Sequence, residues 1–154
     1  MKRSLTVLMV MVTALLLLVG ESPVAAADSA VGSWVKKAEA GMPVMTQDIE
    51  EWSPGKAKLT WHVAQANMVL TIVSALDGTF APLLLNGKPS GETMSTKLVA
   101  KLHTTTIVKM NGKPFGTSKA TFSADYKTMT VENEYSESMG GNQAGKTTEV
   151  WRRK

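Results

Sequence analysis

Side chains that could carry out metal or acid–base chemistry are few in this sequence and lie far apart. His62 and His103 are its two histidines, and no acidic residue stands near either at the spacing of a zinc site. Cysteine is absent, which excludes both disulfides and thiolate metal ligands. We therefore interpret both histidines as surface residues and predict no metal site.

Methionine is the remaining side chain that could hold a metal ion. Met42 and Met45 form an M-x-x-M pair, and thioether ligands select Cu(I). The other methionines beyond residue 27 are scattered singly, which is typical of methionine filling gaps in an apolar core. We therefore predict neither a copper site nor any other cofactor.

A hydrolase would need a nucleophile beside an oriented base. Ser33, Ser53 and Ser123 lie outside any G-x-S-x-G context. Glu132 and Glu134 share one face of a predicted strand, and we interpret that face as solvent-exposed. The sequence also contains no glycine-rich phosphate loop, dinucleotide fingerprint or calcium loop. No catalytic residue is predicted, although an enzyme of unfamiliar type stays open as an alternative.

The first 27 residues have the pattern of a secretory signal peptide. A basic start at Lys2 and Arg3 precedes an apolar run over residues 5–19, and small residues follow at 24–27. The apolar run is shorter than the roughly 20 residues that a membrane span needs. We expect cleavage after Ala26 or, preferably, Ala27, which would leave a periplasmic or extracellular protein without a stable membrane anchor. An uncleaved anchor is the alternative.

Residues 28–154 then form one domain, which is long enough to build its own core. The whole chain has a formal net charge of +4, and its lysines are scattered along the sequence. A nucleic-acid-binding protein would gather them on one face or interleave them with exposed aromatic residues. We therefore predict no nucleic-acid partner.

The elements of this domain are short extended segments separated by turn signals. Eight candidate strands lie at 57–64, 68–76, 79–85, 93–99, 104–110, 114–123, 127–136 and 146–153, with 32–36 as a possible ninth. Asp77-Gly78, Asn86-Gly87 and Asn111-Gly112 are tight-turn dipeptides. Pro82 restricts its segment to an edge strand or a bulged strand. Residues 38–54 fit neither pattern, and we expect a loop there that covers one end of the fold.

Strands joined by turns this short pair in antiparallel fashion. A meander of eight or nine strands tends to curl and close, because closure removes its exposed edges. The predicted fold class is therefore all-β, a single antiparallel up-and-down barrel. A two-sheet sandwich is the alternative.

The start of this domain resembles the first signature of the lipocalin superfamily. The signature is a G-x-W triplet, which here is Gly32-Ser33-Trp34. In lipocalins the tryptophan closes one end of the barrel, and an arginine near the end of the last strand packs across its ring. The resemblance implies that Gly32 and Trp34, with Arg152 or Arg153, form a seal at one barrel end.

A longer resemblance, to small exported bacterial proteins described as lipocalin-like and of the calycin type, covers nearly the whole domain. The shared elements are a G-[ST]-W start, an S-P-G element, N-G-K-P turns and an S-x-D-x-K-T-M-T-V segment. In this chain they lie at 32–34, 53–55, 86–89 with 111–114, and 123–131. No activity is generally assigned to that group, so the resemblance implies a fold and export but no function.

The interior of the barrel is the remaining candidate for a functional site. Such an interior either fills with side chains or holds one small ligand. If the apolar strand faces point inward, the lining consists of Trp61, Leu70, Ile72, Phe80, Leu98, Phe122, Val131 and Tyr135. We predict that these residues bind a small apolar molecule. The alternatives are a filled barrel that serves as a structural or protein-interaction module, and a barrel enzyme.

Overall fold

The structure is a computed structural model that describes residues 29–38, 43–137 and 144–154. The predicted signal peptide and both of its cleavage sites lie outside these residues. Within the described part of the chain, no helix is long and apolar enough to cross a membrane.

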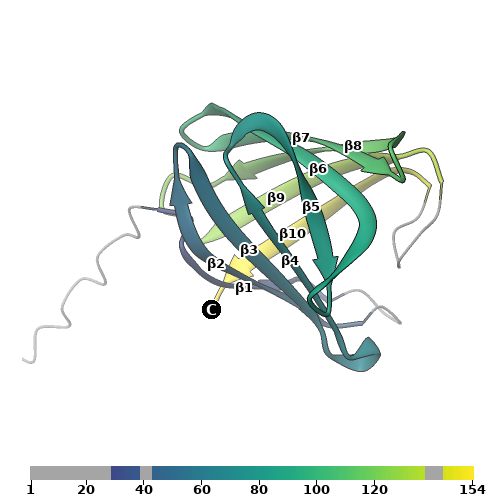
Figure 1. Ribbon diagram of the computed structural model, residues 1–154. Helices are drawn as coiled ribbons and strands as arrows, with labels where there is room; N and C mark the ends of the chain where they lie inside the picture. Colours follow the sequence, from purple (N-terminus) through teal and green to yellow (C-terminus); the bar gives the residue numbers. More distant parts are fainter. Residues whose placement is uncertain (1–28, 39–42, 138–143) are drawn as a thin grey trace, which may run out of the picture.

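Ten antiparallel strands form a closed barrel (Figure 1). The strands are β1 (Gly32–Lys36), β2 (Met45–Ser53), β3 (Lys56–Val63), β4 (Met68–Ser74), β5 (Asp77–Leu85), β6 (Lys88–Ala100), β7 (His103–Met110), β8 (Lys113–Phe122), β9 (Thr128–Tyr135) and β10 (Gly145–Arg153), with a short 3₁₀ turn, η1 (Ala64–Ala66), after β3. Each strand pairs with its neighbours in the chain, and β10 closes the sheet by pairing with β1. The predicted all-β up-and-down barrel is therefore confirmed, with ten strands instead of eight or nine.

The additional strand is β2, in the segment that was predicted to be a loop. That prediction was wrong, because β2 pairs with β1 on one side and with β3 on the other. Gln47 and Ile49 are both buried, which is the period-2 pattern of a strand. A register shift between Ile49 and Glu51 interrupts the alternation. The bulge is the reason that the pattern is hard to see in the sequence.

Two of the three predicted tight turns are confirmed. Asn86-Gly87 has φ values of 48° and 78°, and Asn111-Gly112 has 48° and 79°. Positive φ at both central residues is what a type I′ hairpin turn requires. Asp77-Gly78 belongs to β5 instead, and Leu76 takes the positive φ of 59° before it. Pro82 stands beside a register shift in β5, so this strand is bulged as predicted.

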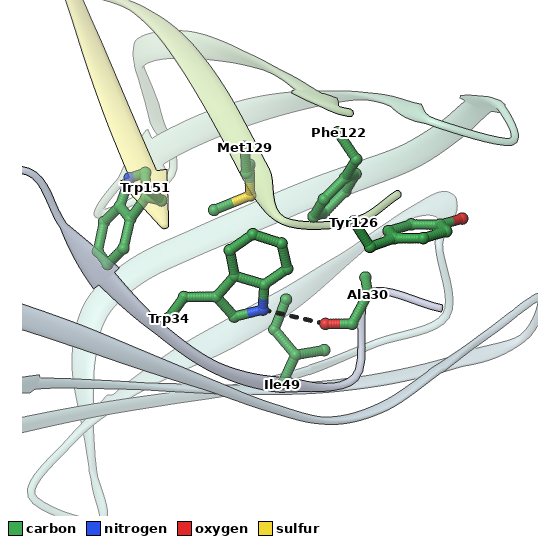
Figure 2. Close-up of a cluster of buried hydrophobic side chains, with 7 residues drawn as sticks. All are labelled: Ala30, Trp34, Ile49, Phe122, Tyr126, Met129 and Trp151. Carbon is green, nitrogen blue, oxygen red and sulfur yellow. Dashed lines mark hydrogen bonds between the residues drawn. The ribbon is translucent and has the colours of Figure 1, made fainter. Parts of the chain in front are cut away.

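A cluster of buried side chains fills one end of the barrel (Figure 2). Its members are Ala30, Trp34, Ile49, Phe122, Tyr126, Met129 and Trp151, each less than 5% exposed. The Trp34 indole is fully buried, and its Nε1 donates a hydrogen bond to the Ala30 carbonyl at 3.0 Å. The Phe122 ring meets it edge-on, with 5.7 Å between ring centroids. Trp34 is therefore the centre of a packed apolar end.

Arg153, on β10, links the last strand to the segment just before β1, beside this cluster. Its Nη1 donates a hydrogen bond to the Ser29 carbonyl at 3.1 Å, and its Nη2 donates one to the Val31 carbonyl. The guanidinium carbon lies 5.8 Å from the centroid of the Trp34 ring. This distance is within the range of a cation–π contact.

Gly32 is needed at its position because Arg153 lies so close. A Cβ atom added there would stand 2.7 Å from Nη2 of Arg153, and the φ of Gly32 is +142°. A larger residue would meet both a steric and a backbone penalty. Arg152, the other arginine considered for the seal, is exposed. The structure thus brings Gly32, Trp34 and Arg153 together and leaves Arg152 outside.

Candidate functional site

A cavity of about 350 Å³ lies inside the barrel. Every strand except β1 contributes side chains to its wall. Its volume falls within the range of about 300–1,000 Å³ that is usual for small-molecule pockets. The described barrel is therefore hollow, which strand periodicity alone could not establish.

Most of the residues predicted to line the interior lie on the cavity wall. They are Trp61, Leu70, Ile72, Phe122, Val131 and Tyr135. Trp61 and Leu70 are directly opposite each other on β3 and β4, so their side chains share one face of the sheet. Whether these side chains contact a ligand stays a prediction.

Phe80 and Leu98 do not line the cavity. Phe80 stands opposite Ser95 on β6, between Met94 and Thr96, which do line it. Because neighbouring residues of a strand face opposite sides, Phe80 points outward. It is 40% exposed, and the Lys109 ammonium lies 4.1 Å from its ring centroid. Leu98 is half-buried two residues beyond Thr96, where β6 leaves the cavity.

Several further wall residues were missed by sequence reasoning. They include the aromatic residues Trp52, Phe115 and Trp151 and the methionines Met45, Met68, Met94 and Met129. Trp52 and Met45 were hidden because β2 was taken for a loop. The scatter of single methionines over apolar strands was the available signal for Met68, Met94 and Met129.

A polar network lines the part of the wall formed by β8 and β9. Ser118 Oγ donates a hydrogen bond to Asn133 Oδ1 at 2.6 Å, and the Tyr135 hydroxyl donates to the same oxygen at 3.4 Å. Gly116 makes room for Tyr135, because an added Cβ would lie 2.5 Å from its ring. Phe115 packs on the other side, with ring centroids 5.4 Å apart. The tyrosine is therefore held in place with its polar groups satisfied.

Two carboxylates also reach the cavity, and Glu149 on β10 is the paired one. Its Oε1 lies 2.7 Å from the Lys36 ammonium, and its Oε2 accepts a hydrogen bond from Trp151 Nε1 at 3.2 Å. The Glu149 side chain is 16% exposed and that of Lys36 is 20% exposed. This charge is thus compensated within the protein.

Glu92 is the second carboxylate. It shares the inner face of β6 with Ser90 and Met94. Residues 89–92 fall between the predicted strands at 79–85 and 93–99 and were taken to extend the loop after Asn86-Gly87, so the inward position of Glu92 was missed. Burial raises the pKa of the Glu92 carboxyl above its ordinary value. Burial also raises the pKa of the Tyr135 hydroxyl. The hydrogen bond with Ser118 lowers this pKa in part, and the negative charges of Glu149 and Glu92 raise it further.

Outside the cavity, a serine, an aspartate and a histidine meet on the barrel surface. Ser33 Oγ donates a hydrogen bond to Asp48 Oδ1, and His62 Nε2 lies 3.1 Å from Asp48 Oδ2. A hydrolytic triad needs the histidine between the serine and the aspartate, because the imidazole must take the serine proton. Here the aspartate stands in the middle, so the arrangement does not activate Ser33.

Among the described residues, no group of three or more histidine, cysteine, aspartate or glutamate side chains is placed to hold a metal ion. Neither a family model, nor a curated protein, nor a solved structure matches the chain. The class of protein is therefore defined by its fold and its site: it is a closed antiparallel β-barrel with an internal, mostly apolar cavity.

Proposed function

We propose that this protein binds a small, largely apolar molecule inside its barrel, as an exported carrier or sensor of the lipocalin-like type. The observation that carries the proposal is the cavity of about 350 Å³. Aromatic, aliphatic and methionine side chains dominate its wall. A cavity with such a wall favours any apolar molecule that fits, because binding removes apolar surface of the molecule from water.

The burial of apolar surface sets an upper limit on the affinity. A ligand that buries about 300 Å² of apolar surface gains about 7.5 kcal/mol at about 25 cal/mol per Å². The loss of translational and rotational freedom opposes this gain. Because micromolar binding corresponds to about −8 kcal/mol, a generic apolar ligand of this size should bind no more tightly than micromolar.

Titration with pyrene, a neutral and strongly apolar fluorophore, tests the proposal. We expect saturable binding to the wild type, and binding about tenfold weaker to Trp61→Ala, because that variant loses an aromatic contact on the wall. Phe80→Ala is the matched control, since it removes an aromatic ring from the outer face. If the wild type does not saturate, the proposal is wrong. The alternative is then an interaction module that uses the exposed apolar residues of the outer face, such as Val73, Phe80 and Ile107.

Export is the second part of the proposal, and the pattern of residues 1–27 supports it. We expect protein recovered from outside the cytoplasm to begin at Asp28 or Ala27. The intact mass of the exported product measures this directly. Full-length chain in the membrane fraction would contradict cleavage and indicate an uncleaved anchor.

A further inference from the structure

The charge on the cavity wall has a single sign. Among the described residues that line the cavity, the ionisable side chains are Glu92, Tyr135 and Glu149, and all three are acids. Lysine, arginine and histidine do not occur among these wall residues. A ligand with a carboxylate or phosphate group would therefore enter next to two carboxylates and meet no cation on the wall.

The two carboxylates differ in what compensates them. Glu149 is paired with Lys36 and accepts a hydrogen bond from Trp151. Glu92 takes part in none of the ion pairs found among the described residues, and its carboxylate makes no hydrogen bond there either. A partly buried charge without a partner is unfavourable. Glu92 is thus the charge that a bound molecule could compensate.

Glu92 lies toward the end of the barrel opposite the Trp34 cluster. It stands near the start of β6, opposite Met110 at the end of β7. In an antiparallel barrel the end of β9, at Tyr135, lies at the same rim. Trp34, near the start of β1, packs with Phe122 at the end of β8, so the apolar cluster occupies the other rim. The Glu92 carboxylate thus lies toward one end of the cavity, and the buried apolar cluster closes the other end.

We propose that the molecule bound in this barrel is a cationic amphiphile, with its apolar chain directed toward Phe122 and its protonated amine head paired with Glu92. The inference rests on the proposed function, and it names the chemical class of the ligand for the same cavity. The chain buries apolar surface against the wall, and the ammonium supplies the missing partner of the carboxylate. Tyr135 lines the cavity toward the same rim, and an aromatic ring offers the face that cations prefer.

Three amphiphiles with the same chain test the inference: dodecylamine, dodecan-1-ol and dodecanoate, each displacing bound pyrene at neutral pH below the concentration at which it aggregates. We expect dodecylamine to bind about tenfold more tightly than dodecan-1-ol, and dodecanoate to bind most weakly. In Glu92→Gln, dodecylamine should lose about tenfold in affinity, dodecan-1-ol should be unchanged, and dodecanoate should improve.

Glu132→Gln is the matched control, because it removes the same charge from the exposed face of β9. It should leave all three affinities unchanged. The whole chain has a net charge of +4, so non-specific attraction favours dodecanoate and works against the expected result. An amine preference therefore has to come from the cavity.

The outcomes separate the inference from the proposed function. Equal binding of the three amphiphiles, tightest binding of dodecanoate, or an amine preference that survives in Glu92→Gln overturns the inference and leaves cavity binding intact. If pyrene and all three amphiphiles fail to bind, both ideas are wrong. A preference for the amine that disappears in Glu92→Gln and persists in Glu132→Gln supports the inference.

Discussion

Replacing Trp34 by alanine should destabilise the barrel more than replacing an exposed aromatic residue. The indole is fully buried in the end cluster, donates a hydrogen bond to Ala30 and packs edge-on against Phe122. Truncating a buried aromatic side chain costs about 3–5 kcal/mol, through lost burial and the cavity left behind. Since a whole domain is stable by only about 5–15 kcal/mol, this is a large fraction of the total.

Trp34→Phe separates the contribution of aromatic packing from that of the Nε1 hydrogen bond. It keeps an aromatic ring in the cluster and leaves the Ala30 carbonyl without its indole donor. An unsatisfied buried polar group costs about 1–3 kcal/mol, so this variant should lie between the wild type and Trp34→Ala. It also keeps the prediction testable if Trp34→Ala does not fold.

The contribution of Arg153 to stability should depend on Trp34. The Arg153 guanidinium lies over the indole and donates hydrogen bonds to two carbonyls of the segment before β1. Arg153→Lys retains the charge but cannot reproduce the planar fork. A double-mutant cycle with Trp34→Phe should yield a coupling free energy of about 0.5–2 kcal/mol. A coupling of zero would mean that the two side chains merely lie near each other.

Urea unfolding followed by far-ultraviolet circular dichroism measures these differences, because four tryptophans would complicate a fluorescence signal. The midpoint should shift while the denaturant slope stays constant. Phe80→Ala is the control, since that ring is 40% exposed and its loss should cost well under about 1 kcal/mol. If Trp34→Ala matches Phe80→Ala, Trp34 does not stabilise the barrel end and the reasoning is refuted.

Two further predictions concern single positions. Gly32→Ala should destabilise the protein by about 1–3 kcal/mol, because the added Cβ would lie 2.7 Å from Arg153. Gly87→Ala is the control, because the space around Gly87 is open and the variant bears only the backbone penalty. Equal urea midpoints for the two variants would contradict the steric explanation. Glu92→Gln should become increasingly stable relative to wild type as the pH rises from about 4.5. Burial raises the folded-state pKa of Glu92, so the wild type loses stability between its unfolded and folded pKa values and the uncharged variant does not. Tyr135 and Glu149, the other ionisable groups among the described wall residues, are the same in both proteins. A difference in unfolding free energy that is constant from acid to neutral pH would refute this prediction.

The fold class could be predicted because its signals are local. Alternation placed Leu59 and Trp61 on one face of a strand, and Asn86-Gly87 and Asn111-Gly112 specify hairpin turns through positive φ. The failures have local causes as well. The bulge after Ile49 broke the alternation of β2, and β6 continues through Gly91, whose φ is +84°. Pattern reasoning therefore assigned residues 38–54 and 89–92 to loops.

The cavity and its charge could not be predicted from the same signals. Alternation says which side chains face inward, but the space between them depends on the diameter of the barrel, which grows with the number of strands. Missing β2 therefore meant expecting a narrower barrel. Missing the first residues of β6 meant that Glu92 was assigned to a loop, although it is the carboxylate on which the proposed choice of ligand rests.

The end cluster and the carboxylate that we propose selects the ligand lie toward opposite ends of the barrel, although Phe122 and Trp151 of the cluster also line the cavity. The side chains that close the fold, Trp34 and Arg153 among them, lie at one end, and Glu92 with Tyr135 lies toward the other. A change at the first end should therefore lower the urea midpoint with little effect on the ranking of ligands. A change at Glu92 should alter that ranking in a barrel that stays folded. Because each change should move one measurement and leave the other in place, their comparison distinguishes a carrier whose ligand preference is set by Glu92 from a barrel that is merely hollow.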